Sequence, residues 1–382
     1  MHEPTLTHEI ERPTSVLVDL DRLTRNYALL RERAGPARVM CIVKANAYGH
    51  GLVPVARHLQ AHGADGFGVA YLEEGVHLRN AGITAPILVM GGIVGEQIPL
   101  FLAHDLTLTA SSVDKLLAVD ACAAALGRKA RVHLKIDTGM ERIGVHWYHA
   151  DRILDASLRC PNVEVEGIFS HFANADSLDL AHARIQLERF HDVLRWYEHR
   201  SLPTPVRHIS NSGGLLQLPD ADLDMVRPGI LLYGVYPDDA LARTIPVEPA
   251  LSWRTTVTFF KVVAAGDPVS YGSTWAPETP SRVVTLPVGY GDGYLRSASN
   301  RAQVVIRGER HPSVGRICMD QLMVDVGPDG TAYHGDDVAL IGGGGPGSIR
   351  VEELARWAGT IPHEVLTNIN TRVPRRYLSR AD

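Results

Sequence analysis

Strand-like apolar runs alternate with amphipathic stretches of helical periodicity through the first two thirds of this sequence. The apolar runs cover residues 38–43, 66–70, 86–90, 106–110, 131–136, 163–169, 206–210 and 223–226. Helical patterns lie between them at 53–62, 72–81, 95–103, 112–126, 149–159, 179–198 and 212–217. Alternation of this kind is typical of α/β proteins in which helices connect the strands of a parallel sheet. Eight such units over about 200 residues predict a TIM-type (β/α)8 barrel.

The competing architecture is a doubly wound open sheet, which is built from the same alternation. Its dinucleotide-binding form carries a G-x-G-x-x-G turn after the first strand. The segment that follows the run 38–43 reads K-A-N-A-Y-G-H-G and lacks that turn. The barrel is therefore favoured over the open sheet.

The pattern changes beyond residue 243. Strand-like segments then follow one another with turns between them, at 252–263, 282–287, 303–307, 312–318, 322–326 and 338–341, and one late helix is expected at 351–358. We predict that residues 1–242 form the barrel domain and that residues 243–382 form a mainly β C-terminal domain. One more strand is expected near 15–20, before the barrel pattern, and it could pack with the β domain.

The composition excludes several classes of function. The 382 residues carry a formal net charge of −5 with both signs scattered along the chain, so no nucleic-acid partner is expected. No apolar run reaches the roughly 18 residues of a membrane helix, and the polar segment 1–13 is unlike a signal peptide. The cysteines have neither paired nor metal-like spacing: Cys41, Cys122, Cys160 and Cys318. A cytoplasmic protein without a metal site is the expectation.

Lys44 stands where the first apolar run of the barrel ends, in the segment C-I-V-K-A-N-A-Y-G-H-G. Because the strand before it should be buried, its ammonium group must reach out of the core. A lysine at a strand end usually extends its charged end into water. The alternative is a lysine held in a pocket, where its pKa falls and it can form a Schiff base.

Polar residues also follow the later barrel strands, at the end where barrels place their catalytic groups. They are Lys135, inside the end of the fifth run, with Arg142 just beyond it, Ser170 and His171 for the sixth, Asn211 and Ser212 for the seventh, and Arg227 for the eighth, where Gly229 and Ile230 follow. The Asn-Ser-Gly-Gly segment opens a helix, whose N–H groups and hydroxyl could bind a phosphate. Ser212 could equally be an ordinary N-cap. A pocket that holds both a lysine and a phosphate site points to pyridoxal phosphate (PLP).

An ordered set of motifs covers almost the whole chain and resembles the alanine racemases. The motifs are V-K-A-N-A-Y-G-H-G at 43–51, K-I-D-T-G-M at 135–140, S-H-F at 170–172, N-S at 211–212, R-P-G-I at 227–230, V-S-Y-G at 269–272, G-Y-G-D-G at 289–293, I-C-M-D-Q at 317–321 and R-V-P-R at 372–375. The lysine motif is strong alone, and the ordered set is very specific.

The resemblance implies a PLP-dependent isomerase that interconverts L- and D-alanine. D-Alanine supply for peptidoglycan is the implied role, with alanine breakdown as the other role open to such an enzyme. Lys44 would hold PLP through a Schiff base, and Arg227 would face the pyridine nitrogen. The implied phosphate contacts come from Ser212, from the backbone at Gly229 and Ile230, and from the Tyr48 hydroxyl, and Asn211 is a further cofactor-binding residue.

Racemisation requires the α-proton to leave from one face and to return on the other, so two bases are expected. The resemblance assigns these roles to Lys44 and Tyr271. An unperturbed tyrosine has a pKa near 10, so Tyr271 needs a partner, and His171 would lie between it and Arg227. In the family this tyrosine comes from the other subunit, which implies a homodimer with a shared active site. Without the resemblance, Tyr271 would be read as a turn tyrosine that packs its ring.

The resemblance assigns three further roles. Arg142 would orient the cofactor phenolate and the substrate carboxylate, and the Met319 N–H would bind that carboxylate. Lys135 matches a position that carries a carbamate in many family members. Thr371 departs from the pattern, because some members carry there a tyrosine that contacts the phosphate and narrows the entrance.

Three other functions compete with alanine racemisation. A racemase of serine or larger amino acids could use the same scaffold. A decarboxylase with a similar barrel keeps other motifs, so V-S-Y-G and I-C-M-D-Q argue against it. A non-catalytic PLP carrier has only the barrel, and the second domain with Tyr271 argues against that function.

Overall fold

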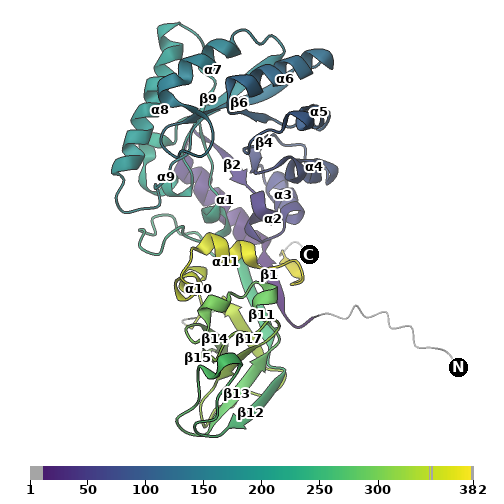
Figure 1. The fold of residues 1–382 in the computed structure, drawn as a ribbon, viewed down its shortest axis with the longest axis vertical. Coiled ribbons are helices and arrows are strands. Elements are labelled where there is room, and N and C mark those ends of the chain that lie inside the picture. The colour runs from purple at the N-terminus through teal and green to yellow at the C-terminus, as the bar shows by residue number, and fades with distance from the viewer. Residues whose placement is uncertain (1–11, 344, 346, 380–382) are drawn as a thin grey trace, which may run out of the picture. The chain divides into compact units, whose positions relative to one another are not determined.

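The computed structural model describes residues 12–343, 345 and 347–379 (Figure 1). Residues 1–11 lie outside the described residues. They make up most of the polar segment 1–13, which is unlike a signal peptide. The chain divides into two compact units. We call Leu20–Glu248 the barrel unit, and Met1–Asp19 together with Pro249–Asp382 the β unit.

The barrel unit is a closed ring of parallel strands. Its strands are β2 (Arg38–Ile42), β3 (Gly66–Val69), β4 (Ile87–Val89), β5 (Leu108–Ala110), β6 (Ala130–Asp137), β8 (Val163–Phe169), β9 (Val206–His208) and β10 (Met225–Val226). Parallel pairing runs in the orders β10-β2-β3-β4 and β5-β6-β8-β9. A parallel bridge from Leu88 to Thr107 joins β4 to β5. The Arg227 N–H donates to the Ser210 carbonyl (3.0 Å) and closes the ring beside β9 and β10.

Helices follow the strands and cover the ring from outside, as Figure 1 shows. They are α1 (Leu20–Ala34), α3 (Leu52–Ala61), α4 (Leu72–Asn80), α5 (Ile98–Ala103), α6 (Val113–Ala125), α7 (Ala150–Ser157), α8 (Ala181–His199) and α9 (Ser212–Gln217). In α1, Leu23, Tyr27 and Leu30 recur at helical spacing and are buried. Strand β3 has no polar side chain and every one of its residues is buried, as expected for a strand of a parallel sheet that is covered on both faces. The predicted (β/α)8 barrel is confirmed.

The β unit is built on one mainly antiparallel sheet in the order β12-β13-β16-β15-β14-β17-β11-β1-β18. These strands are β1 (Ser15–Asp19), β11 (Leu251–Thr256), β12 (Phe259–Val263), β13 (Ser281–Leu286), β14 (Gln303–Ile306), β15 (Glu309–Val314), β16 (Leu322–Asp325), β17 (Asp337–Ile341) and β18 (Arg375–Leu378). The early strand β1 pairs with β11 and β18, so the amino-terminal strand is part of this sheet. The described part of the unit also contains the α-helices α10 (Val351–Ala358) and α11 (Pro362–Asn368).

The segment 252–263, expected as one strand, is two strands in the structure. The chain changes partners between them: β11 pairs with β17, whereas β12 pairs with β13. Val257 N–H donates to Asp336 (2.9 Å) and Thr258 N–H donates to Thr285 (3.0 Å), so the break keeps its backbone groups bonded. The interruption is invisible in the sequence because the apolar pattern continues through it.

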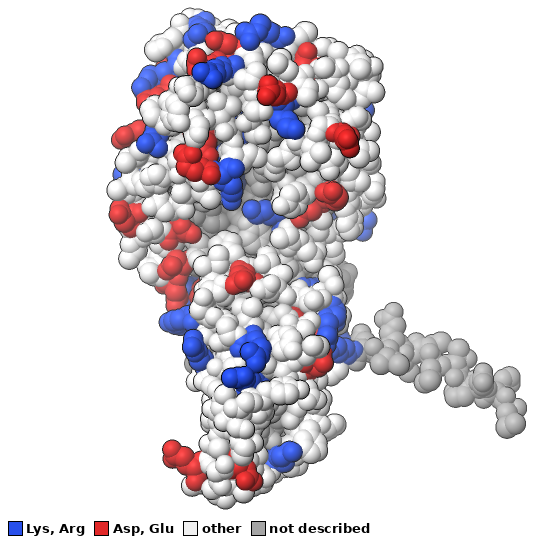
Figure 2. Space-filling view, in the orientation of Figure 1, with Lys and Arg blue, Asp and Glu red and all other residues white. Residues whose placement is uncertain are grey.

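Acidic and basic side chains are interspersed over the face drawn in Figure 2, as the scattered charges of the sequence predict. Among the described residues, none of the helices combines the length and the apolar character that crossing a membrane requires.

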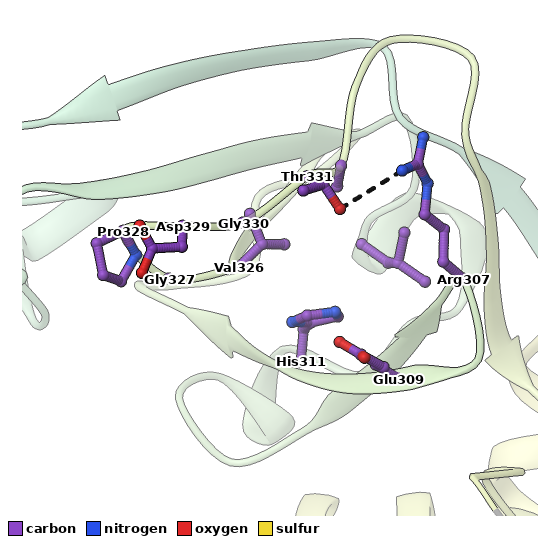
Figure 3. A pocket seen from close by; sticks show the side chains of 11 residues that line it. Arg307, Glu309, His311, Val326, Gly327, Pro328, Asp329, Gly330 and Thr331 are labelled. Carbon is purple, nitrogen blue, oxygen red and sulfur yellow. Dashed lines mark hydrogen bonds between the residues drawn. The ribbon is translucent and has the colours of Figure 1, made fainter.

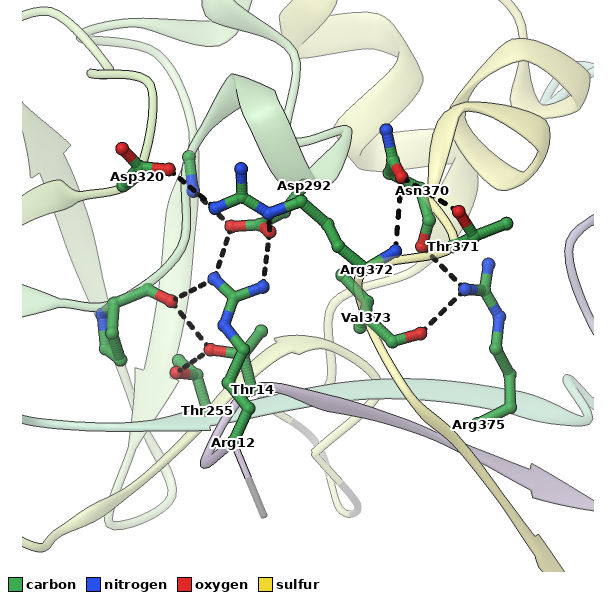
Figure 4. A network of polar contacts seen from close by, with 12 residues as sticks. Arg12, Thr14, Thr255, Asp292, Asp320, Asn370, Thr371, Arg372, Val373 and Arg375 are labelled. Carbon is green, nitrogen blue, oxygen red and sulfur yellow. Dashed lines mark hydrogen bonds and ion pairs between the residues drawn. The ribbon is translucent and has the colours of Figure 1, made fainter. Parts of the chain in front are cut away.

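A buried carboxylate connects distant parts of the β unit (Figure 4). Asp292 is fully buried and accepts hydrogen bonds from Arg12 Nη2 (2.7 Å) and from its own loop at the Gly289 N–H (3.0 Å). Arg372 adds an ion pair through Nε (2.9 Å). One carboxylate therefore fastens the 289–293 loop to the segments that lead into β1 and into β18.

We expect Asp292→Asn to lower the free energy of unfolding by about 2 kcal/mol, because two charge-assisted bonds to arginine are weakened at a buried site. Asp320 is the matched control: it also pairs with Arg372, but its side chain is 59% exposed. Asp320→Asn should change the stability by less than about 0.5 kcal/mol. Denaturant titration measures both. Equal losses in the two variants would contradict a special role for Asp292.

Candidate active site

Lys44 opens a backbone turn of unusual conformation. Strand β2 ends at Ile42, and α2 (Lys44–Tyr48) follows with Ala45, Asn46 and Ala47 at φ of 53°, 56° and 52°. These are left-handed values, which cost an L-residue about 1–2 kcal/mol each. The Asn46 side chain stabilises the turn by accepting a hydrogen bond from the Leu52 N–H (2.8 Å). The abrupt end of the strand at Lys44 is thus a built feature of the chain.

The side chain of Lys44 lines a cavity of about 360 Å³ in the barrel unit. The cavity brings together residues from four strand ends that the sequence had singled out: Lys44, Lys135, Arg142, His171 and Arg227. Burial, Arg142 and Arg227 lower the pKa of Lys44, and the carboxylate of Glu74 opposes them. The lysine is therefore held in a pocket and is not simply extended into water.

Arg227 lies at the floor of this site and is 3% exposed. Its guanidinium donates to His208 Nδ1 (2.8 Å), the Ser170 carbonyl (2.8 Å) and His171 Nδ1 (3.3 Å). Burial lowers the pKa of Arg227 to about 9, so it remains protonated at neutral pH. Because a guanidinium only donates, both histidine nitrogens that face it must accept. His171 and His208 are consequently neutral.

His133 continues the chain of hydrogen bonds that runs from Arg227 through His208. Since His208 accepts at Nδ1, its Nε2 carries the proton and donates to His133 Nδ1 (2.8 Å). Burial and then Arg227 lower the pKa of His133 to about 3, so it too is neutral. Gly167 gives its ring room, because a Cβ there would lie 2.6 Å from the His133 ring. Sequence reasoning missed both histidines, although His133 shares a strand face with Lys135 at period two.

Lys135 is buried beside the same cations. Its Nζ donates to the Ile136 carbonyl (2.9 Å) and lies 5.1 Å from the centre of the Phe169 ring. Burial first, and then Arg227, lower the pKa of Lys135 to about 7. The amine is therefore partly neutral near physiological pH.

The loop that carries Arg142 is ordered by Asp137. Its carboxylate accepts hydrogen bonds from the N–H groups of Gly139 (2.8 Å), Met140 (2.9 Å) and Arg142 (3.1 Å). Burial acts against these bonds, but the backbone donors prevail and lower the pKa of Asp137. The signal was present in D-T-G, because Asp commonly bonds to the backbone that follows it in a turn.

Three groups expected at the phosphate converge in the barrel unit. Asn211, and not Ser212, caps α9, since its side chain accepts from the Gly214 N–H (2.9 Å). The Ser212 hydroxyl instead accepts from the Gly229 N–H (2.9 Å). The Tyr48 hydroxyl lies against Gly229, where an added Cβ would be 2.3 Å from it. The close approach requires glycine at 229. Ile230 follows as the buried start of the short helix η4 (Ile230–Tyr233).

Tyr271, Met319 and Thr371 belong to the β unit. Tyr271 begins the short helix η5 (Tyr271–Ser273) and is 70% exposed. The preceding Ser270 fixes the turn by donating to the Arg316 carbonyl (2.6 Å). Met319 is also exposed, and its carbonyl accepts from the Gly291 N–H (2.8 Å). Two expected site residues, Tyr271 and Met319, are thus held on fixed loops of this unit.

Another cavity of the β unit, of about 540 Å³, contains none of the predicted site residues (Figure 3). Arg307, Glu309 and His311 line one side of it, and the loop 326–332 lines the other. The Arg307 guanidinium donates hydrogen bonds to the Thr331 hydroxyl (3.4 Å) and to the Asp336 carboxylate (3.0 Å). Lys44, Lys135, Arg142, His171 and Arg227 line the cavity of the barrel unit and not this one.

The barrel pocket has the character of a site for an anion with a carbonyl group. Burial first, and then the arginines, lower the pKa values of Lys44, Lys135 and His171, and an anionic ligand would relieve this crowding of positive charge. The pKa of Lys44 is lowered, first by burial and then by Arg142, and this favours the amine form that reacts with an aldehyde. A phosphate, a phenolate and an aldehyde occur together in PLP, so the residues present fit that cofactor.

The pKa of Lys135 predicts a pH-dependent effect of its removal. The unfolded chain keeps the Lys135 proton up to about pH 10.5, but the folded chain keeps it only up to about pH 7. Between these values the unfolded state binds more protons, so this group's destabilising effect is full below pH 7 and fades as the pH rises.

Lys135→Met should therefore be more stable than the parent at about pH 6, by about 2 kcal/mol, with the advantage shrinking toward about pH 10. Denaturant titrations in CO2-depleted buffer measure the difference at each pH. An advantage that does not change with pH would contradict the lowered pKa.

Comparisons with known proteins agree with this geometry. The family described as "Alanine racemase, N-terminal domain" matches residues 18–237, and "Alanine racemase, C-terminal domain" matches residues 250–377. The alanine racemase of Carboxydothermus hydrogenoformans is 43% identical over 96% of this chain and 100% of its own length. That of Symbiobacterium thermophilum is 44% identical over 96% of this chain and 97% of its own. The alanine racemase crystal structure from Streptomyces lavendulae superimposes with a TM-score of 0.92 at 37% identity, over 97% of this chain and 98% of that one.

Proposed function

Because the chain belongs to the alanine racemase family and interconverts L- and D-alanine, we propose that it does so with PLP bound through Lys44 and with Lys44 and Tyr271 as its two bases. The observation that carries the proposal is the barrel pocket, in which a lysine of lowered pKa is grouped with Arg142, His171 and Arg227. The family's dependence on PLP and the chemistry of these side chains support the same cofactor.

The pocket offers contacts for each part of PLP. Tyr48, Ser212 and the Gly229 N–H would hold the phosphate, with help from Asn211 and the Ile230 backbone at the same strand ends. Arg142 would face the phenolate. When bound, PLP supplies an electron-withdrawing system that makes the α-proton of the amino acid acidic.

Arg227 would set the electronic state of the cofactor ring. A protonated guanidinium beside the pyridine nitrogen disfavours protonation of that nitrogen. The hydrogen bonds to His208 and the Ser170 carbonyl hold the guanidinium in place, so it can keep this role throughout turnover. A weaker electron sink limits side reactions such as transamination.

The two bases would serve opposite faces of the α-carbon. Lys44 would be the base on one face, and burial, followed by Arg142 and Arg227, lowers its pKa and so favours the unprotonated amine that a base requires. Tyr271 would hold or release the proton on the other face. His171 is neutral with its Nδ1 bonded to Arg227, which leaves its Nε2–H to bond to the Tyr271 oxygen. The substrate carboxylate would bind Arg142 and the Met319 N–H.

We also propose that Lys135 carries a carbamate. A partly neutral amine can attack CO2, forming a nitrogen–carbon bond and releasing one proton, and Lys135 has a pKa lowered to about 7. The anion produced would replace a positive charge with a negative one beside Arg142 and Arg227. This exchange would relieve the crowding of like charges in the pocket.

The two-base proposal predicts direction-dependent isotope effects. Tyr271→Phe removes the hydroxyl that serves one face, so turnover should fall about 10³-fold. Proton transfer on that face should then limit the rate in both directions, but it removes the α-deuteron of the substrate in only one of them. Kinetic isotope effects with α-deuterated L-alanine and D-alanine measure this, and they should be unequal. Equal effects in the two directions would argue against separate bases.

The active site is proposed to be shared in a homodimer, with Lys44 and Tyr271 from different subunits. Lys44→Ala and Tyr271→Phe homodimers should each be nearly inactive. In an equal mixture of exchanged subunits, half of the dimers are mixed, and each mixed dimer has one site of two with both wild-type residues. Activity should recover to about a quarter of the wild-type value. If both bases came from one chain, the mixture would stay as inactive as its parents.

A further inference from the structure

The left-handed turn after Lys44 needs a partner outside itself. Ala45, Asn46, Ala47 and Tyr48 are consecutive non-glycine residues with φ between 51° and 56°. Such a run persists only where surrounding contacts hold it. The Asn46 bond to Leu52 closes the far end of the turn. At the near end, next to the lysine, the Ala47 N–H donates to the Val43 carbonyl (2.8 Å), and a side chain from another helix adds a further contact.

The partner at the near end is the carboxylate of Glu74 in α4. Its Oε1 accepts a hydrogen bond from the Ala45 N–H, the residue directly after Lys44, at 2.6 Å. Its Oε2 accepts from the Ala70 N–H (2.7 Å) and the Tyr71 N–H (3.2 Å), just beyond the end of β3. One half-buried side chain therefore joins the ends of two neighbouring barrel strands.

An ordinary helix cap explains only part of this arrangement. Glu74 is the third residue of α4 and bonds back to the N-cap residue Tyr71, as a capping box does. A capping box uses a single carboxylate oxygen on its own helix. The other oxygen is committed to the Ala45 N–H, 29 positions earlier in the chain, and serves no capping function.

Glu74 is also a negative charge beside the positive charges around Lys44. The charged groups that act on the Lys44 amine are Arg142, Arg227 and Glu74. The arginines favour loss of the proton, together with burial, whereas Glu74 favours its retention. The same carboxylate thus contacts the backbone beside Lys44 and balances the charge at its amine.

We propose that Glu74 is a positioning residue for Lys44, which clamps the backbone at Ala45 and so fixes both the direction of the lysine and the charge around its amine. The inference rests on the proposed role of Lys44 as the residue that binds PLP. Glu74 touches neither cofactor nor substrate in this role, so it acts through the lysine.

The test compares Glu74→Gln with Glu73→Gln. Both changes remove one negative charge from the first turn of α4, but Glu73 is exposed to solvent. PLP is removed from each protein and added back, and its attachment is followed by visible absorbance as a function of pH. This rate reports the neutral Lys44 amine, and the titration gives the dissociation constant of PLP. Denaturant midpoints show whether the variants are folded.

We expect Glu74→Gln to bind PLP about tenfold more weakly and to reach half-maximal attachment rate at a lower pH than the wild type. The pH shift is the sharper result, because a merely structural helix cap would not move it. Glu73→Gln should match the wild type in both measurements. Wild-type behaviour of Glu74→Gln would overturn the inference.

Glu74→Asp covers the case in which Glu74→Gln does not fold. It keeps the charge but shortens the reach to the Ala45 N–H, so it should weaken PLP binding with little change in the pH of attachment. Wild-type affinity in this variant would also overturn the clamp. Failure of the proposed function itself would give a different result: the Lys44→Ala variant would show the same PLP absorbance as the wild type.

Discussion

Repulsion among buried cations is the constraint on which the barrel site depends. Lys44, Lys135, Arg142 and Arg227 line one cavity, and each lysine has a lowered pKa for which burial and the arginines are responsible. Such crowding is unfavourable unless negative charge compensates it. It is tolerated here because it makes the pocket complementary to anions and lowers the pKa of both lysines. The energetic cost and the chemical use of the site have the same origin.

The groups that hold these cations are mostly not the groups that would react. Asp137 orders the Arg142 loop through backbone N–H groups, and His208 holds Arg227 from within the barrel. Each uses a directional hydrogen bond, so each fixes an orientation as well as a position. The parallel strands bring Asp137 and His208 to the same end of the barrel as the cations that they hold. One ring of short strands can therefore support a dense polar site.

The sequence was sufficient for the strands of the barrel and for the placement of Lys44, because periodicity and strand-end chemistry are local signals. It was not sufficient for features that depend on contacts between distant segments. Strand β18, with the sequence R-R-Y-L, has no apolar alternation and exists because β1 offers it a parallel partner. The capping role of Asn211 in place of Ser212 depends on the Gly229 N–H, which occupies the serine hydroxyl. His208 carried no motif that set it apart from the other histidines.

The contact between Gly167 and His133 has an evolutionary consequence. The two residues lie on neighbouring strands, β6 and β8, in direct register across a bulge. Any side chain at 167 would collide with the imidazole, so enlargement there is permitted only if position 133 shrinks at the same time. Loss of the imidazole would in turn leave the His208 Nε2–H without its acceptor. Drift at these two sites is therefore expected to be correlated, and single substitutions at either one should be selected against along the lineage of this chain.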